Sequence, residues 1–133
     1  MKMLDTNICI HLIKHKPPEV IERFDKERAN GICISAITLA ELELGVEKST
    51  QKERNQLALA MLLGTINVLP FDDLAAIEYG KIFAYLQRNC TPVGKMDILI
   101  GAHARSLGIP IVTNNTKDFE RMPGLILENW VKN

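Results

Sequence analysis

Apolar and polar residues alternate along this chain in short blocks that predict strands and helices in turn. Short apolar segments predict strands at residues 1–4, 32–34, 67–71, 108–112 and 125–127. Helical spacing predicts helices from residue 8 to Pro17, then over 18–27, 38–48, 51–66, 73–89 and 95–107. Strands that alternate with helices are typical of an α/β domain. We therefore expect a single domain over residues 1–133, with a central, mostly parallel sheet flanked by helices on both faces.

Two helices have apolar residues at positions that predict an inward face. In the helix over 73–89, Asp72 and Asp73 supply the cap and a charge that suits the helix dipole. Its expected inward residues are Leu74, Ile77, Ile82, Tyr85 and Leu86. In the helix over 51–66 they are Leu57, Ala60, Met61 and Leu62.

Composition narrows the class of protein. A chain of 133 residues with 47% hydrophobic and 24% charged residues has enough apolar side chains for one core. Sixteen basic and sixteen acidic residues cancel, so overall charge gives no sign of nucleic-acid binding. Three scattered cysteines suggest neither disulfides nor a zinc site. Without a long apolar segment or a signal-peptide pattern, we expect a cytoplasmic protein that does not enter the membrane.

Four acidic residues lie just after predicted strands or at helix starts, and each has a local explanation. Asp5 follows the first strand, where an acid also caps a helix. Glu41 lies three residues after Thr38, the spacing of a capping box. Asp97 would suit a helix dipole, and Asp118 would suit a turn.

The four positions nevertheless share one edge of the expected sheet. Ligands of open α/β sheets bind outside the carboxyl ends of the strands. Two carboxylates about 4 Å apart repel by roughly 4 kcal/mol at an effective dielectric of 20, so a cluster of four requires a cation. Oxygen donors without Cys or His suit Mg²⁺. Such an ion activates water and stabilises charge on a phosphoryl group, which predicts phosphodiester hydrolysis.

The histidines give a weaker signal. His11 and His15 are four residues apart, but no glutamate and no third ligand complete a zinc site. His103 lies between alanines on a predicted buried helix, where a packing role is expected.

Three other classes of protein fit parts of the pattern. A haloacid dehalogenase-type phosphatase needs a second acid where this chain has Asn7. A phospho-acceptor receiver needs paired acids beside Asp5 and a central aspartate, and residues 31–71 contain no aspartate. A non-enzymatic interaction module would tolerate the loss of acids, and all four are present.

Five blocks, in this order, resemble the PIN-domain toxins of the VapC family. They are Met3-Leu4-Asp5-Thr6-Asn7, Ile37-Thr38-Leu39-Ala40-Glu41-Leu42-x-x-Gly45, Thr91-Pro92-Val93-Gly94-x-x-Asp97, Ile100-x-Ala102-His103-Ala104 and Val112-Thr113-Asn114-Asn115-x-x-Asp118-Phe119. The closing Pro123-Gly124-Leu125-x-x-x-Asn129-Trp130 also resembles that family. Lys95-Met96, just before Asp97, departs from the usual proline or asparagine with an aromatic residue, which puts substrate contacts in doubt.

The resemblance implies a ribonuclease of a type II toxin–antitoxin system that depends on Mg²⁺ or Mn²⁺. Asp5, Glu41 and Asp97 match the metal-binding acids of the family, and Asp118 matches a fourth, more distant one. Thr6, Ser35, Thr113 and Asn115 match positions that hydrogen-bond these acids. Asn7 is expected to cap the first helix.

The resemblance also implies partners. Similar proteins cut structured RNA, with the anticodon stem-loop of initiator tRNA as the expected substrate, and form homodimers. A VapB-type antitoxin would lay its C-terminal segment along an apolar groove and place an Arg or Lys in the acidic site, giving a toxin–antitoxin hetero-oligomer. A PIN-type nuclease of RNA processing is the alternative within the same fold. The candidates for a basic rim are Lys14, Lys16, Lys48, Lys52, Arg54, Lys95, Arg105, Lys117 and Arg121.

Overall fold

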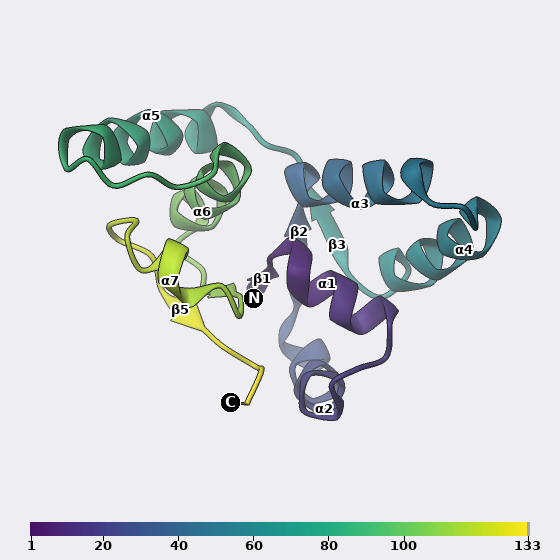
Figure 1. Ribbon diagram of the computed structural model, residues 1–133. Coiled ribbons are helices and arrows are strands. Elements are labelled where there is room, and N and C mark those ends of the chain that lie inside the picture. The colour runs from purple at the N-terminus through teal and green to yellow at the C-terminus, as the bar shows by residue number, and fades with distance from the viewer. Residues whose placement is uncertain (133) are drawn as a thin grey trace.

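A five-stranded parallel sheet lies at the centre of the computed structural model, which describes residues 1–132 (Figure 1). The strands lie side by side in the order β3-β2-β1-β4-β5, and each neighbouring pair is parallel. The predicted fold class is therefore confirmed, although four of the strands are shorter than expected and β2 is one residue longer. They are β1 (Lys2–Leu4), β2 (Ile32–Ser35), β3 (Asn67–Leu69), β4 (Ile111–Val112) and β5 (Leu127–Glu128).

The helices connect the strands and divide into two groups (Figure 1). One group lies on the side of β2 and β3: α1 (Thr6–Ile13), α2 (Pro18–Glu27), α3 (Ala36–Lys48) and α4 (Lys52–Leu63). A 3₁₀ turn, Arg28–Asn30, follows α2. The other group lies on the side of β4 and β5: α5 (Asp73–Arg88), α6 (Lys95–Leu107) and α7 (Thr116–Phe119).

Alternate residues of the strands pack into two separate hydrophobic cores, one on each face of the sheet. Leu4, Ile34 and Val112 belong to a cluster with the apolar side chains of α1 to α4, and this cluster also takes in Trp130. The strand residues between them belong to a second cluster with α5, α6 and Phe119; they are Met3, Cys33 and Ile111. This alternation is the period of two that a sheet requires when both of its faces are buried.

The predicted inward faces of two helices are partly wrong. In α4, Leu62 is buried, but Leu57 and Met61 are 64% and 68% exposed, and Ala60 is exposed as well. The run from Leu57 to Leu63 is apolar almost throughout, so its periodicity does not single out one face. In α5, Ile82 and Leu86 are buried as predicted, whereas Leu74, Ile77 and Tyr85 are exposed.

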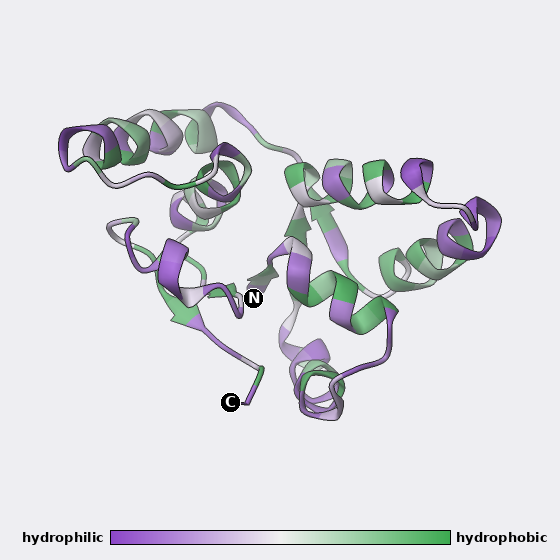
Figure 2. Cartoon of the chain, in the orientation of Figure 1, coloured by the Kyte–Doolittle hydropathy of each residue, from purple (hydrophilic) through white to green (hydrophobic). Residues whose placement is uncertain are grey.

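Figure 2 shows mostly hydrophobic strands, with a few hydrophilic positions, between helices that carry both hydrophobic and hydrophilic residues. No helix among residues 1–132 combines the length and the apolar character that a bilayer span requires.

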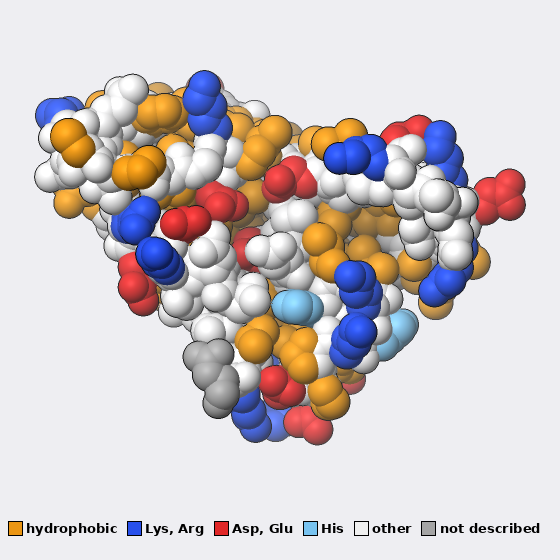
Figure 3. Space-filling model, in the orientation of Figure 1, with side chains coloured by type: hydrophobic (Ala, Val, Ile, Leu, Met, Phe, Trp, Pro, Cys, Tyr) orange, Lys and Arg blue, Asp and Glu red, His pale blue; other side chains and the backbone are white. Residues whose placement is uncertain are grey.

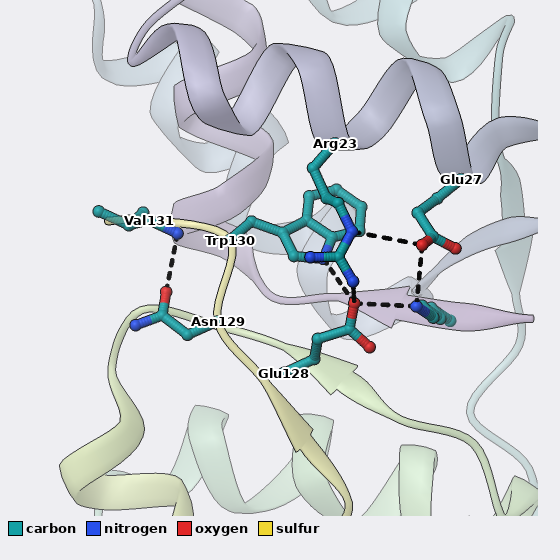
Figure 4. A network of polar contacts seen from close by, with 7 residues as sticks. Arg23, Glu27, Glu128, Asn129, Trp130 and Val131 are labelled. Carbon is teal, nitrogen blue, oxygen red and sulfur yellow. Dashed lines mark hydrogen bonds and ion pairs between the residues drawn. The ribbon is translucent and has the colours of Figure 1, made fainter. Parts of the chain in front are cut away.

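A polar network fastens the C-terminal strand to the first strand and to α2 (Figure 4). Glu128 accepts hydrogen bonds from Lys2 Nζ at 2.8 Å and Trp130 Nε1 at 2.8 Å. Arg23 and Glu27 of α2 complete it: Arg23 pairs with Glu128, and Lys2 lies 3.2 Å from Glu27. The network therefore holds the tail against the β1 and α2 side of the molecule, where Trp130 packs into the core.

Candidate active site

Asp5 lies at the carboxyl end of β1 and is also the N-cap of α1. Its Oδ1 accepts a hydrogen bond from the Ile8 backbone N–H at 2.9 Å, and its Oδ2 accepts one from the Thr113 hydroxyl. Asp5 therefore does cap a helix, as the local explanation predicted, and it also lies at the edge of the sheet where a site was expected. The prediction that Asn7 caps this helix is wrong, because α1 begins at Thr6 and Asn7 is an exposed residue inside the helix.

Asp5 is only 3% exposed, and this burial controls its protonation. Burial raises the pKa of the Asp5 carboxyl to about 6, the hydrogen bonds from Thr113 and Ile8 oppose the rise, and the charges of Asp97 and Glu41 add to it. A carboxylate held away from water among other carboxylates is one that a cation would stabilise.

Glu41 is not part of a capping box. Helix α3 begins at Ala36, and its cap is Ser35, whose Oγ accepts from the Ile37 N–H at 3.1 Å. The local explanation for Glu41 is therefore wrong, because Thr38 is a buried residue inside the helix. Glu41 instead accepts a hydrogen bond of 2.6 Å from the hydroxyl of Thr6, the first residue of α1.

Asp97 and Asp118 come from the other group of helices and share one donor. Asp97 lies in the first turn of α6 and Asp118 in α7. Asn115 Nδ2 donates to Asp118 Oδ2 at 3.1 Å and reaches Asp97 Oδ2 at 3.4 Å. Burial raises the pKa of Asp97, and the charges of Glu41 and Asp118 raise it further. Arg121 Nη1 lies 3.8 Å from Asp118 and balances part of this negative charge.

The structure thus brings the four predicted acids to one edge of the sheet, Asp5 and Glu41 from one group of helices and Asp97 and Asp118 from the other. Figure 3 shows acidic side chains gathered where the two groups meet, with Lys and Arg side chains on either side. Burial raises the pKa of both Asp5 and Asp97, and one carboxylate of the opposite group adds to each rise, Asp97 for Asp5 and Glu41 for Asp97.

The donor set suits a hydrated, hard cation. All four side chains offer oxygen only, which Mg²⁺ and Mn²⁺ prefer. Within residues 1–132, no group of three or more His, Cys, Asp or Glu side chains is placed so that it could hold a metal ion as it stands. Mg²⁺ keeps several waters and takes only one or two direct carboxylates, so this open arrangement fits it better than a closed protein cage would.

Three of the four predicted supporting residues contact an acid, and one does not. Thr113 donates to Asp5, Asn115 to Asp118 and Asp97, and Thr6 to Glu41. Within residues 1–132, Ser35 forms no hydrogen bond with an acid, so that prediction is wrong; its Oγ lies 2.8 Å from His103 Nδ1. No sequence signal joined these two residues, which are 68 positions apart.

The other two histidines do not share a helix. Helix α1 ends at Ile13, and His15 lies beyond it with a left-handed backbone (φ 56°). His103 is 2% exposed and packs edge-on against Phe71, as expected for a packing histidine.

A groove of about 730 Å³ runs between α1, α3 and α4 and includes Glu41 in its wall. Its apolar lining consists of Ile10, Ile13, Leu42, Val46, Ala58 and Leu59, and its charged lining of Lys14, Lys16 and Arg54 besides Glu41.

The parallel sheet with acids at its carboxyl edge is the arrangement of a PIN domain, and the family model described as "PIN domain" matches residues 2–125. The chain is 50% identical over 128 residues to the tRNA(fMet)-specific endonuclease VapC of Shigella flexneri and 48% identical to that of Salmonella typhimurium, covering 96% of each chain in both cases. Within the PIN-domain proteins, the chain belongs to the VapC family.

Solved structures agree with this placement. The VapBC2 complex of Rickettsia felis, bound to a promoter DNA fragment, contains a chain that superposes with a TM-score of 0.94 at 39% identity, with 98% of both chains covered. The DNA-bound VapBC of Salmonella typhimurium gives a TM-score of 0.93 at 47% identity, again over 98% of both chains.

Proposed function

We propose that this chain is the toxin of a type II toxin–antitoxin pair, an endoribonuclease that uses Mg²⁺ or Mn²⁺ to hydrolyse initiator tRNA in the cytoplasm. The relatives named tRNA(fMet)-specific endonuclease support this substrate, since they align over 96% of the chain. Ribonucleases with this domain generally use divalent metal ions.

One observation carries the proposal: four carboxylates from separate segments meet at one sheet edge, with Asp5 buried among them. Burial raises the pKa of Asp5 to about 6, and the charges of Asp97 and Glu41 contribute to the rise. Among the described residues, the one ion pair that involves the four acids joins Arg121 to Asp118, so Asp5, Glu41 and Asp97 have no basic side chain paired with them. A bound divalent ion would supply that balance.

The chain's own residues divide the work. Asp5 and Asp97 would hold the ion, Glu41 would hold or orient water bound to it, and Asp118 would act from a greater distance. When bound, the ion supplies an activated water and positive charge that stabilises the phosphoryl group during displacement. Thr113, Thr6 and Asn115 fix the orientation of the carboxylates by donating to them.

The charges around the acids suit an RNA backbone. Exposed basic residues flank the acidic cluster on both sides (Figure 3). Lys14, Lys16 and Arg54 line the groove beside Glu41. An acidic centre and a basic rim together explain a net charge of zero in a protein that binds RNA.

The test is cleavage of an initiator tRNA transcript by the purified protein with Mg²⁺ and with EDTA. Asp5→Asn and Asp97→Asn should each lower the cleavage rate at least about a hundredfold, because each removes a negative oxygen donor from the ion. Asp73→Asn, an exposed aspartate at the start of α5, is the matched control and should cleave normally. Equal activity of wild type, Asp5→Asn and Asp97→Asn, or full activity in EDTA, would refute the assignment.

We also propose that a VapB-type antitoxin occupies the groove between α1, α3 and α4 and places an Arg or Lys beside Glu41, and that the toxin forms a homodimer within the complex. The groove is apolar along its walls and acidic at Glu41, which suits an amphipathic segment with a basic residue. Ala58→Asp, a change at a partly exposed groove residue of α4, should abolish co-purification with the antitoxin encoded beside this gene and leave tRNA cleavage intact. If Ala58→Asp co-purifies with the antitoxin as wild type does, the groove is not the binding site.

A further inference from the structure

A buried hydrogen bond joins α6 to the start of α3 behind the acids. His103 Nδ1 and Ser35 Oγ lie 2.8 Å apart, and both side chains are buried, at 2% and 0% exposure. Among the described residues, this is the one side-chain hydrogen bond between α6 and either β2 or α3. It therefore ties together two segments that otherwise meet through apolar contact.

The two segments are those that carry Asp97 and Glu41. His103 lies on α6 six residues after Asp97, and Ser35 caps α3 six residues before Glu41. About 9 Å of helix separates each acid from the bond, at 1.5 Å per residue. A change in the distance between His103 and Ser35 therefore moves one acid relative to the other.

The surroundings of the pair favour a fixed geometry. Phe71 packs edge-on against the His103 ring, with centroids 5.4 Å apart and an interplanar angle of 79°. Ser35 also accepts from the Ile37 N–H, so its hydroxyl hydrogen is free to point at His103. Burial lowers the pKa of His103, which keeps the ring neutral and able to accept this hydrogen.

We propose that His103 and Ser35 are positioning residues that set the separation of Asp97 and Glu41 and thereby the affinity of the site for a divalent ion. The inference rests on the metal-dependent activity proposed above. Among the described residues, neither side chain forms a hydrogen bond with one of the four acids, so each acts through the helix that carries the acid.

Four variants separate this role from a general effect on folding. His103→Phe keeps a ring against Phe71 but removes the hydrogen-bonding atom, and Ser35→Ala removes its partner. His103→Asn keeps a polar atom near the position of Nδ1. Ile100→Val, a fully buried change on the same helix, is the control for lost packing in α6.

The measurements are Mn²⁺ binding to the free protein by calorimetry and tRNA cleavage over a Mg²⁺ titration. His103→Phe and Ser35→Ala should weaken Mn²⁺ binding about five- to tenfold, less than the roughly 10- to 100-fold that is typical when a residue hydrogen-bonded to a metal ligand is lost, because these two residues act only through the helices. Both should raise the Mg²⁺ concentration for half-maximal cleavage equally, with little change in the rate at saturation. His103→Asn should recover most of the affinity, and Ile100→Val should bind Mn²⁺ like wild type. The double variant should be no worse than either single variant, because both remove the same bond.

The outcomes distinguish the two proposals. If wild type cleaves without metal, or Asp97→Asn remains active, the proposed function fails. If wild type needs metal but His103→Phe and Ser35→Ala bind Mn²⁺ normally, or Ile100→Val weakens binding as much as they do, the positioning role is refuted. Should His103→Phe not fold, Ser35→Ala compared with Ile100→Val decides the question in the same way.

Discussion

Replacing Asp5 with asparagine is expected to stabilise the metal-free protein at pH 8, although it removes the central acid of the site. Burial raises the pKa of Asp5 from 3.8 to about 6. The folded chain therefore keeps a proton that the unfolded chain releases, and stability falls as the pH rises through this window. Above about pH 6 the charged carboxylate costs about 3 kcal/mol relative to its protonated form.

The expected gain in the free energy of unfolding is smaller than this cost, because an asparagine side chain is a poorer acceptor than a carboxylate for the hydrogen bond from the Thr113 hydroxyl. Subtracting about 1–2 kcal/mol for poorer hydrogen bonds leaves a gain of about 1–2 kcal/mol. With an unfolding entropy of about 2.1 cal/mol/K per residue, this corresponds to a Tm rise of about 4–7 °C.

Thermal unfolding followed by circular dichroism in EDTA measures this difference at pH 8 and at pH 4. Asp5→Asn should unfold at a higher temperature than wild type at pH 8 and lose this advantage at pH 4, where wild-type Asp5 is protonated when folded. Saturating Mg²⁺ at pH 8 should raise the Tm of wild type more than that of the variant. A variant that is less stable at pH 8, or a difference that is the same at both pH values, would show that Asp5 carries no electrostatic penalty.

Three further changes test other parts of the structure. Thr6→Val removes the hydroxyl that donates to Glu41, and should slow cleavage about tenfold while stability changes by at most about 1 kcal/mol; normal cleavage would contradict the proposed role of that contact. Gly101→Ala should destabilise the protein by about 1–2 kcal/mol in urea titrations, since a Cβ would lie 2.7 Å from a buried methionine sulfur, whereas Gly80→Ala in open space should stabilise it by about 0.5–1 kcal/mol. Glu128→Ala should loosen the C-terminal tail and shift the emission of Trp130, the single tryptophan, to longer wavelength; an unchanged spectrum would show that other contacts hold the tail.

The sheet and the acids were predictable because they depend on short-range pattern and on topology. Apolar runs gave the strands, and parallel strands place the residues that follow them at a common edge, so Asp5 and Asp118 were predicted together without any contact information. Asp97 and Glu41 were predicted from their places at helix starts and from the family resemblance.

The details that failed depend on where a helix begins and on which neighbour covers it. The capping box around Glu41 was wrong because Ser35, rather than Thr38, caps α3. The predicted inward face of α4 was wrong because the second half of that helix has apolar residues on all sides. Only its packing against the rest of the protein determines that Leu59 and Leu62 are the buried ones. The contact between Ser35 and His103 joins segments with no shared pattern, so only three-dimensional structure reveals it.

The strand order has a consequence for when the protein can become active during synthesis. β1 is made first, but it lies between β2 and β4, and Thr113, which holds Asp5, follows β4. A nascent chain that has not yet released residues 111–118 from the ribosome has neither the strand that completes the β1 pairing nor the fourth acid. The four acids can therefore come together only after residues 111–118 have left the ribosome, and a shorter nascent chain lacks the complete cluster.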